Sequence, residues 1–571
     1  MCGFLVSMDG SGLKIDEALF AKALNLQNHR GPDDTKFAVF KNGLMGFKRL
    51  AIIDLSSKAS QPRKHGPITV AMNGEIYNYK ELREELKAKG HVFESAGDAE
   101  VFAALLHVYG LEEACKRARG MWAMVAHDET NGKWFVSRDR LGIKPLCMAK
   151  VGGQLSFSSE IKSLITLFPE LKKLNRYVLE SYLTGGHLDA SEESFFENIR
   201  AFPAGHFAEV GGDLSCTAKP FWKLGADGEE KADPERLKML MEEAVELHMR
   251  SDVLVGLALS GGLDSTILAY FAKKNPDLKT YSVRPPEAQD ESHLIDQTVK
   301  LLGLKHRYLP CEEFESLKWI DFLLQKMDQP FKAAQTLYQF AIRKQAAEDG
   351  VKVFLVGDGA DEVYGGYTKC VYPYLADLLR EREWGEWIRS AWRFQAFTGI
   401  PFRLLLLSSW RGRTSEGIKE FLMKRLLSEP IPYYLRIEDG ISMSVSLETR
   451  VPFLDHVLLE EAMRCKSAEF MRDGKNKAML RNAMNAVLPQ HVKENPKKFQ
   501  RPGSSKRIIF NVLWKEAAEL FSEAGKKETA LSWGISEKQF LEDRENGENS
   551  SFWMRAFLAL RWMQVTGFSK Y

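Results

Sequence analysis

A cysteine stands directly behind the initiator methionine in the opening stretch "MCGFLVSMDG". If Met1 is removed, Cys2 carries a free α-amino group beside its thiol, and an amine with a pKa of about 7.7 to 8.0 can accept the thiol proton through a water molecule. Cys2 would then act as a nucleophile without a histidine. A Cys–His pair is the alternative chemistry, for which His29 and His65, both in turn-like segments, are the nearest candidates.

A second chemical signature is "LALSGGLDSTILAYF", in which an apolar run leads through two glycines into a helical pattern. Glycines let backbone N–H groups approach an anion closely, and the start of the following helix carries partial positive charge. We therefore predict a phosphate-binding loop formed by Ser260, Gly261, Gly262, Leu263, Asp264 and Ser265. The loop lacks the Gly-Lys-Ser/Thr ending of a Walker motif, so we expect a magnesium ion on Asp264 to balance a bound triphosphate. A glycine-rich turn without chemistry is the alternative.

A third signature, "VFLVGDGADEVYGGY", repeats this design and adds the acids Asp358, Asp361 and Glu362. Ligands of open α/β sheets bind at the carboxyl ends of the strands, so we expect both glycine-bearing loops to face one site. Asp264 and Asp361 would then share the metal on the pyrophosphate, and Asp358 would lie near the reacting carbonyl. A solvated turn with a helix N-cap is the alternative reading of these acids.

Two different scaffolds are needed to position these candidates. Up to about residue 210, short strands with turn signals alternate with helices such as Tyr79 to Gly90. From about residue 253, the apolar runs "VLVGLALS", "KTYSV" and "VKVFLVG" alternate with helical patterns, which predicts a parallel sheet covered by helices. The last third is mostly helical in pattern. We predict domains at residues 1–211 and 235–571, joined by a Gly-, Asp- and Lys-rich linker at 212–234.

Length and composition agree with two domains. The 571 residues exceed the roughly 250 to 300 that one core usually serves. Lys and Arg (79) nearly balance Asp and Glu (77), so we expect neither a nucleic-acid nor a membrane partner. No apolar run approaches the roughly 20 residues that span a bilayer, and no signal-peptide pattern is present. Seven scattered cysteines without a CxxC pair favour a reducing, cytoplasmic location.

Several stretches together resemble the glutamine-hydrolysing asparagine synthetase family. "LSGGLDST" is similar to the pyrophosphatase loop of ATP-pyrophosphatases, and "GDGADEVYGGY" and "SMSVSLETRVPFLDH" resemble the synthetase domain. The family adenylates a carboxylic acid with ATP and lets ammonia displace AMP. The resemblance implies that Leu259, Val283 and Gly357 help to bind ATP. It also implies that Lys477 in "GKNKAMLR" is the catalytic lysine, although a lone lysine at a helix start is usually a surface residue.

The N-terminal residues resemble the class II glutamine amidotransferases that supply ammonia in this family. The similar stretches are "HRGPDD", "KRLAIIDL", "AMNGEIYNY", "SAGDAEV", "RDRLGIKPL" and "FSSEIKSL". The resemblance implies that Arg49, Glu75 and Asp98 bind glutamine, with Arg49 as a fork for the α-carboxylate and Asp98 as the partner of the α-ammonium. Asn73, also in contact with glutamine, and Gly74 would form the oxyanion hole. Taken alone, Asn73-Gly74 is equally a hairpin-turn signal.

The fold and reaction follow from the same resemblance. It implies an α/β and α+β protein: an αββα N-terminal nucleophile (Ntn) sandwich, then an ATP-pyrophosphatase domain of the adenine nucleotide α hydrolase-like type with a helical C-terminal part. Cys2 would release ammonia from glutamine, and an internal tunnel would carry it to an acyl-AMP formed with ATP and Mg²⁺. Asp358 is the candidate base for the incoming nitrogen, where many family members have glutamate. Dimers are common in the family, so a homodimer is also expected.

Aspartate is the expected acceptor, which would make asparagine the product. Uronic acids of surface polysaccharides and natural-product precursors are alternatives, because "DQPFKAAQTLYQF" and "VRPPEAQDES" differ from the commonest synthetases. A β-lactam-forming cyclase usually lacks the N-terminal cysteine. A non-catalytic binding protein on this scaffold would have lost the nucleophile or the phosphate loop, and both are present.

Overall fold

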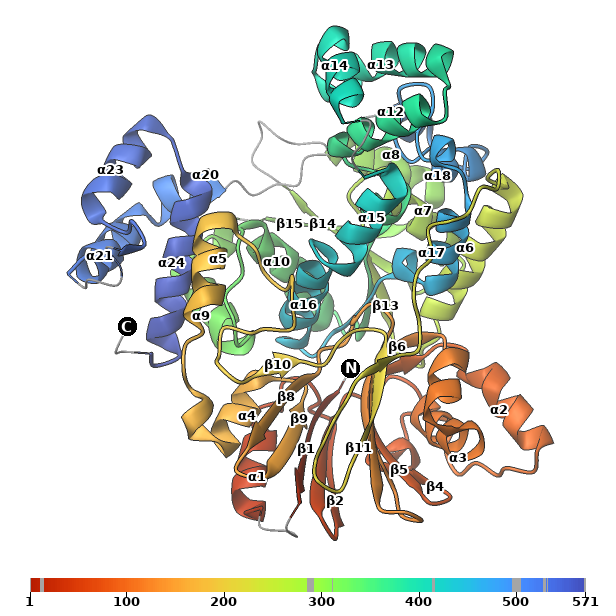
Figure 1. The fold of residues 1–571 in the computed structure, drawn as a ribbon, viewed down its shortest axis with the longest axis vertical. Helices are drawn as coiled ribbons and strands as arrows, with labels where there is room; N and C mark the ends of the chain where they lie inside the picture. Colours follow the sequence, from red (N-terminus) through yellow and green to blue (C-terminus); the bar gives the residue numbers. More distant parts are fainter. Residues whose placement is uncertain are drawn as a thin grey trace.

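The computed structural model describes residues 2–10, 15–284, 292–310, 312–412, 416–494, 505–526, 530 and 532–568. Within these ranges the chain forms two antiparallel sheets of six strands and one parallel sheet of five. In Figure 1 the N-terminal sheets lie at the bottom of the molecule and the parallel sheet lies above them.

The first antiparallel sheet has the order β10-β8-β9-β1-β3-β2. Its strands are β1 (Gly3–Asp9), β2 (Asp34–Phe40), β3 (Gly43–Arg49), β8 (Cys147–Val151), β9 (Gln154–Ser158) and β10 (Arg200–Ala201). The second sheet has the order β12-β11-β7-β6-β5-β4. Its strands are β4 (Arg63–His65), β5 (Ile68–Ile76), β6 (Gly120–Asp128), β7 (Lys133–Arg138), β11 (His206–Val210) and β12 (Lys219–Pro220).

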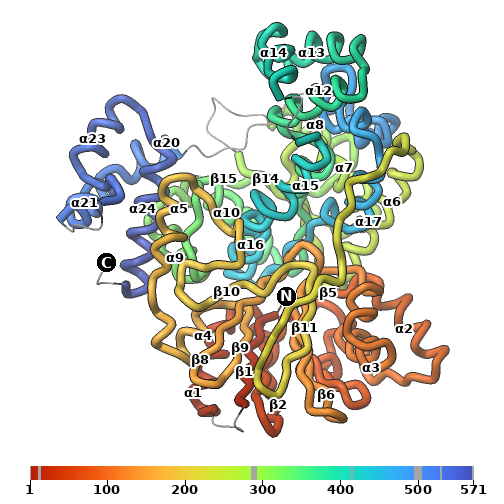
Figure 2. Tube along the Cα trace, in the orientation of Figure 1, coloured from red at the N-terminus to blue at the C-terminus, as the bar shows by residue number. Residues whose placement is uncertain are grey.

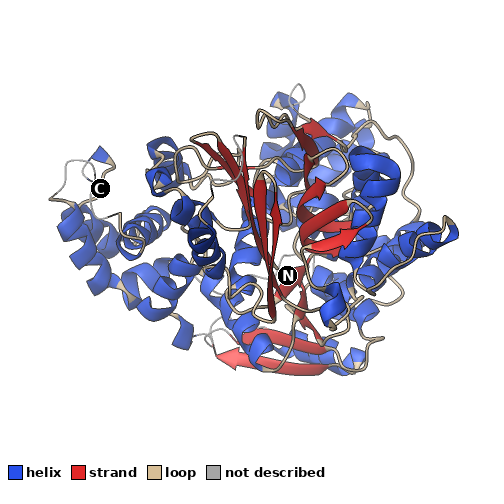
Figure 3. Ribbon diagram, turned by 90° about the horizontal axis from the view of Figure 1, so that it is seen from below, coloured by secondary structure: helices blue, strands red, loops and turns tan. Residues whose placement is uncertain are grey.

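These two sheets face each other between two layers of helices. Helices α1 (Glu17–Asn25) and α4 (Ile161–Leu167) pack on the first sheet, and α3 (Asp98–Arg117), with α2 (Tyr79–Ala88) against it, packs on the second. Phe4, Phe47, Val125 and Trp134 belong to the apolar core between the sheets. Figure 3 shows the strands in the middle of the molecule with helices to either side. The predicted αββα sandwich is therefore confirmed.

The parallel sheet has the order β15-β14-β13-β16-β17. Its strands are β13 (Val255–Ala258), β14 (Lys279–Arg284), β15 (Lys305–Pro310), β16 (Val353–Leu355) and β17 (Glu448–Arg450). The three central strands are those predicted from the apolar runs, and every pairing is parallel. The two edge strands, β15 and β17, were not predicted. Since all five strands run in one direction, their carboxyl ends share one edge of the sheet, where ligands bind.

The remaining segments are mostly helical, as the last third of the sequence predicts. The helices are α5 (Arg176–Gly185), α6 (Pro234–His248), α7 (Leu263–Ala272), α8 (Ser292–Leu302), α9 (Leu317–Lys326), α10 (Gln335–Glu348), α11 (Ala360–Tyr364), α12 (Val371–Arg380), α13 (Trp384–Thr398), α14 (Phe402–Arg411), α15 (Ile418–Leu427), α16 (Ile431–Met443), α17 (His456–Arg464), α18 (Ala478–Ala483), α19 (Gln490–Glu494), α20 (Ser505–Arg507), α21 (Trp514–Ala524), α23 (Glu537–Asn546) and α24 (Ser550–Val565). The last of these packs against α5 and α9 and buries Trp553 and Trp562 (Figure 2). Its aromatic stripe is therefore core.

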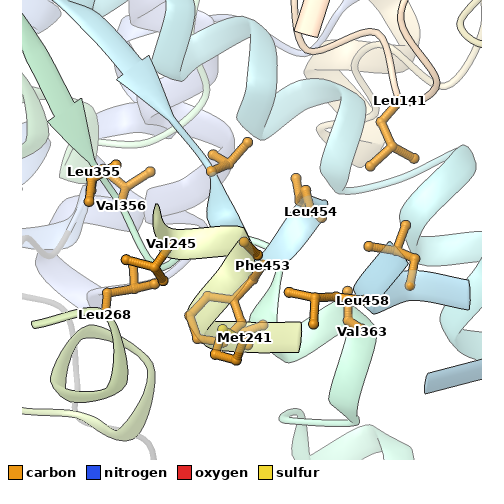
Figure 4. Close-up of a cluster of buried hydrophobic side chains, with 14 of the residues drawn as sticks. Leu141, Met241, Val245, Leu268, Leu355, Val356, Val363, Phe453, Leu454 and Leu458 are labelled. Carbon is orange, nitrogen blue, oxygen red and sulfur yellow. The ribbon is translucent and has the colours of Figure 1, made fainter. Parts of the chain in front are cut away.

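Apolar side chains join the two halves of the chain. Leu141 from the N-terminal half belongs to the same buried cluster as Met241 on α6, Leu355 on β16 and Leu454 (Figure 4). Inside the predicted linker, β12 pairs with β11, and α6 begins at Pro234 with Asp233 as its N-cap. The domain boundaries stay a prediction. None of the helices in the described ranges combines the length and apolarity needed to cross a bilayer.

Candidate functional site

Cys2 lies just before β1 and borders a cavity of about 30 Å³ that four other predicted residues also line: Arg49, Gly74, Glu75 and Asp98. The thiol is 7% exposed, and the backbone N–H of Leu50 donates to Sγ over 3.5 Å. Burial raises the pKa of Cys2 to about 11. The thiol is therefore protonated at neutral pH, and an attack by sulfur requires a base to take its proton.

Asn73 and Gly74 lie in the middle of β5, opposite Ala123 and Trp122 of β6, and not in a hairpin turn. Asn73 Oδ1 accepts a hydrogen bond of 3.0 Å from the Cys2 backbone N–H. The Asn73 Nδ2 is buried and has no hydrogen-bond partner in the part of the chain that the structure describes. A buried amide without a partner is costly, so this donor beside the thiol fits a group that binds oxygen from a substrate.

Gly74 cannot be replaced without disturbing β6. Its φ is +150°, and a Cβ there would lie 2.0 Å from the Met121 carbonyl oxygen. The glycine therefore allows the backbone beside Asn73 to pack against β6 at close range.

Arg49 and Asp98 both belong to the lining of this cavity. The Arg49 guanidinium donates to the Ser56 carbonyl oxygen (2.7 Å) and to that of Asp54, which ties it to the 54–60 segment. Asp98 accepts from the Ile76 N–H at 2.8 Å. Burial, partly offset by backbone hydrogen bonds, raises the pKa of Asp98 to about 6. At neutral pH the cavity thus holds a cation and a carboxylate, as recognition of a zwitterionic amino acid requires.

Two residues from the second half of the chain, which sequence reasoning missed, approach the same cavity. Arg450 Nε lies 2.6 Å from Glu448 Oε1, and Arg450 Nη2 lies 3.8 Å from Glu75 Oε1. Burial and repulsion from Glu448 raise the pKa of Glu75 well above its usual value. Burial opposes ionisation of Glu448 too, but the amino terminus and Arg450 lower its pKa to about 2. The available signal was "LETR", a charged pair inside an otherwise apolar stretch, since buried charges need partners.

Arg30 was also missed, although it belongs to "HRGPDD". It is 1% exposed; its Nε donates to the Cys2 carbonyl oxygen at 3.1 Å, and its Nη1 lies 2.8 Å from Asp439 of α16 and 3.3 Å from Glu160. Arg30 therefore joins the backbone of Cys2 to a helix of the second half.

The second cavity, of about 520 Å³, lies at the carboxyl ends of β13, β14 and β16. The predicted residues that line it are Leu259, Ser260, Gly262, Leu263, Asp264, Ser265, Val283, Gly357, Asp358, Asp361 and Lys477. Gly261 does not line it; its φ is +71°, and a Cβ there would meet the Ile295 side chain at 3.0 Å. The two glycine-bearing loops therefore face one site, as expected.

The two serines at the ends of the 260–265 loop hydrogen-bond to each other. The Ser260 N–H donates to Ser265 Oγ at 3.1 Å, and the two hydroxyl oxygens are 3.0 Å apart. Helix α7 begins directly after Gly262, and no side chain caps its first turn. Backbone N–H groups and the positive helix end thus point at the cavity, which suits a phosphate.

Lys477 joins the two loops. Its Nζ lies 2.6 Å from Asp264 Oδ1 and 2.7 Å from Asp361 Oδ1. Burial disfavours the ammonium, but the two carboxylates outweigh it and the pKa of Lys477 is raised. The lysine is therefore a buried cation inside the site and not a surface residue.

Gly366, which sequence reasoning also missed, makes this convergence possible. A Cβ on it would lie 1.8 Å from Asp361 Oδ1 and 2.4 Å from Lys477 Cε. Asn476 holds the glycine in place by donating to its carbonyl oxygen at 2.8 Å. The available signal was the second glycine of "GGY".

Residues 328–340 and 283–292, which differ from the commonest synthetases, were expected near the acceptor, and only some of them line the large cavity. From residues 328–340, Ala333, Gln335, Thr336, Tyr338 and Gln339 line the large cavity. Asp328 does not; it caps α4 through the Ile161 N–H and pairs with Lys162. Of residues 283–292, Val283 and Ser292 line the cavity, whereas 285–291 lie outside the described residues.

Residues 1–222 match a family described as a glutamine amidotransferase domain, and residues 236–564 match the asparagine synthase family. Asparagine synthetase [glutamine-hydrolyzing] 1 of Bacillus subtilis is 28% identical, covering 86% of this chain and 85% of the relative. A putative asparagine synthetase [glutamine-hydrolyzing] 2 of Methanocaldococcus jannaschii is 33% identical over 62% of this chain and 73% of its own. Asparagine synthetase B of Escherichia coli is 27% identical, with coverages of 82% and 76%.

Proposed function

The chain belongs to the asparagine synthase family of carbon–nitrogen ligases, and from this premise we propose that it transfers the amide nitrogen of glutamine to a carboxylic acid, using ATP. The observation that carries the proposal is the pairing of two sites in one chain. One cavity holds Cys2 with groups for a zwitterion, and the other brings Lys477 and two glycine-bearing loops together.

In the first site Cys2 attacks the side-chain amide of glutamine. Its α-amino group, freed by removal of Met1, takes the thiol proton, and ammonia leaves behind a thioester that water converts to glutamate. Asn73 Nδ2 and the Gly74 N–H stabilise the oxyanion. Arg49 binds the α-carboxylate and Asp98 the α-ammonium, with Glu75 as a further glutamine contact. The partnerless Asn73 amide beside the thiol supports these roles.

In the second site the acceptor carboxylate attacks the α-phosphorus of ATP and releases pyrophosphate. The 260–265 loop holds the phosphates, and Leu259, Val283 and Gly357 line the nucleotide side. Lys477 stabilises negative charge on the adenylate. Asp358 accepts the proton of the incoming nitrogen, and ammonia then displaces AMP.

We include Mg²⁺ in this proposal, held by Asp264 and Asp361. Both carboxylates meet at one point, the Lys477 ammonium, so they already share a cation. Hard oxygen donors of this kind fit Mg²⁺, which usually binds through one or two carboxylates plus substrate phosphates. Among the described residues, no group of three or more His, Cys, Asp or Glu side chains is arranged to hold a metal ion. When bound, the ion would neutralise charge on the departing pyrophosphate.

Ammonia passes between the sites inside the protein. Free ammonia in bulk water would be protonated and lost as a nucleophile. Arg450 contacts Glu75, which lines the first cavity, and Asp439 contacts Arg30, which hydrogen-bonds to the Cys2 backbone. These contacts support an internal passage through this region.

Aspartate is the proposed acceptor. The large cavity also supports a second candidate, a uronic acid or a natural-product precursor. Helix α10 lines it with Gln335, Thr336 and Gln339, whose neutral side chains can hydrogen-bond to hydroxyl groups, beside the charged Arg343. A cytoplasmic location and a homodimer belong to the same proposal.

A Cys2→Ala variant tests the division of labour. It should lose synthesis that depends on glutamine and keep synthesis from ammonium salts, and loss of both activities would refute the proposal. An acceptor screen that follows AMP and pyrophosphate release tests the substrate. Turnover with aspartate would support asparagine formation. Turnover only with uronic acids would make a uronic acid, and not aspartate, the acceptor.

A further inference from the structure

Helices α13 and α14 present large apolar side chains to solvent. Trp384, Trp392 and Trp410 have exposed fractions of 50%, 62% and 43%. Ile388, Leu404 and Leu407 are exposed beside them. We call these six residues the hairpin face. Scattered exposed apolar residues are normal, whereas a gathered set marks an interaction surface.

The hairpin face is continuous across the two helices. On α13, Trp384, Ile388 and Trp392 recur every four residues, so they share one side of the helix. The rings of Trp384 and Trp410 have centroids 6.3 Å apart, which connects this side to α14. The Trp387 Nε1 also donates to Ser409 Oγ at 2.9 Å, so the two helices are fixed to each other.

Packing within the molecule does not account for this face. The hairpin already has an inner side, where Ala391, Phe394 and Leu405 are buried. The helix on the surface of a globular protein normally turns polar residues outward. Apolar residues on both sides of the hairpin therefore indicate a second apolar environment on the outside. In Figures 1 and 2 the hairpin extends from α12 away from the three sheets.

Arginines outnumber acidic residues on the two helices, although Arg389 pairs with Glu386 and Arg393 pairs with Asp473. Between residues 384 and 411 there are four arginines, Arg389, Arg393, Arg403 and Arg411, and one acidic residue, Glu386. The chain as a whole is nearly balanced, with a net charge of +2. Trp and Leu combined with a basic border are typical of helices that lie in the interface of a lipid bilayer, where anionic headgroups attract the cations.

From the exposed tryptophans, their continuity and the surrounding arginines, we propose that the α13–α14 hairpin docks this protein on an anionic membrane surface. The helices would lie in the interface without crossing the bilayer. A second copy of the chain fits less well, because a symmetric contact through this face would bring the two arginine sets together. The proposal differs from the expectation of no membrane partner, which rested on the overall charge balance and on the short apolar runs.

The location of the hairpin gives the docking a consequence for the site. Helix α12 connects the hairpin to Tyr367, which lines the large cavity. Docking would therefore hold the synthetase half, and not the glutaminase half, next to the membrane. The binding itself does not depend on the proposed reaction, so it can be tested separately.

Co-sedimentation of the full-length protein with vesicles provides the test. We expect binding to vesicles of equal parts phosphatidylcholine and phosphatidylglycerol, weak binding to phosphatidylcholine alone, and loss of binding as salt is raised. Replacing Trp384, Trp392 and Trp410 together by Ser should abolish binding. Each of Arg403→Gln and Arg411→Gln should weaken it about fivefold, the effect of removing one charge near an anionic surface.

Matched controls keep the result interpretable. Val92, Tyr177 and Met239 are at least as exposed as the tryptophans but lie elsewhere, so replacing all three by Ser should leave binding unchanged. The tryptophan variant should keep the melting temperature and ammonia-dependent synthesis. Absence of binding to either vesicle, equal loss in the control, or binding that ignores the arginines would overturn the proposal. So would light scattering showing a dimer that the tryptophan variant splits, because the face would then bind a second copy.

Discussion

An Asn73→Asp substitution replaces one hydrogen-bond donor by an oxygen and adds a negative charge at a buried position. Oδ1 of the native side chain accepts from the Cys2 N–H at 3.0 Å, and an aspartate keeps that acceptor. The Nδ2 donor, which has no protein partner in the described part of the chain, becomes an oxygen. If Nδ2 binds the oxyanion, loss of the donor alone should cost about 2.7 to 4 kcal/mol, or a factor of roughly 10² to 10³ in kcat with glutamine. Repulsion between the new carboxylate and the oxyanion adds to this loss.

The assay measures glutamate release and amide synthesis from glutamine and from ammonium in parallel. The ammonium reaction should be unaffected, because the second cavity contains neither Asn73 nor its neighbours. Asn73→Ala adds no charge and should show the loss of the donor alone, roughly 10² to 10³-fold in kcat. Its stability should be lower by about 1 to 3 kcal/mol, since it leaves the buried Cys2 N–H unpaired.

Asn78→Asp is the matched control. Its side chain also makes two backbone hydrogen bonds, to the Arg117 carbonyl oxygen and the Arg119 N–H, but neither of them involves Cys2. Both activities should survive this change. A wild-type glutamine rate in Asn73→Asp would refute the assignment of Nδ2 to the oxyanion hole.

Three further predictions follow from the charges and close contacts of the two sites. Lys477→Met leaves the buried Asp361 and the partly exposed Asp264 without their cation, so synthesis should be lost with either nitrogen source while glutamate release persists; retained synthesis would contradict the role. Gly366→Ala should lower the synthetase rate by about 10²-fold or more through displacement of Asp361, whereas Gly225→Ala, with open space around it, should not. Because the pKa of Asp98 is raised to about 6, its carboxylate is lost as pH falls through that value; the KM for glutamine should rise there, and Asp98→Asn should show a high KM without this pH dependence.

The parallel sheet could be predicted from the residues themselves because its pattern is local, whereas the αββα sandwich followed from the family resemblance. An apolar run followed by "SGGLDS" and a helical pattern predicts a strand, a turn and a helix within fifteen residues, and β13 and α7 are found there. The edge strand β17 could not be found in this way. It has three residues, Glu448, Thr449 and Arg450, two of them charged, and only its place beside β16 makes it a strand.

Site residues were predictable where a motif carries them and not where they act across the interface. Cys2, Asn73 and Asp98 belong to the N-terminal half and converge as expected. Arg30 and Asp439 are 409 positions apart, and no local pattern relates them. Their pairing is explained by burial, because a guanidinium that is removed from water needs a carboxylate partner.

The exposed hairpin face is a further feature that the sequence pattern did not predict. A tryptophan-rich helical pattern predicts core, and α24 fulfils that prediction, with Trp553 and Trp562 buried. In α13 the same residue type lies outside, with Trp392 mostly exposed. Composition alone does not distinguish the two, because the choice depends on which side of the helix the rest of the chain covers.

The transfer of nitrogen within one chain is tested most directly with glutamine labelled with ¹⁵N in its side-chain amide, in the presence of excess unlabelled ammonium. At a pH where most free ammonia is protonated, the account predicts that the amide product of the native protein carries ¹⁵N and that the product of Cys2→Ala does not. An unlabelled product from the native protein, or a labelled one from Cys2→Ala, would contradict the account.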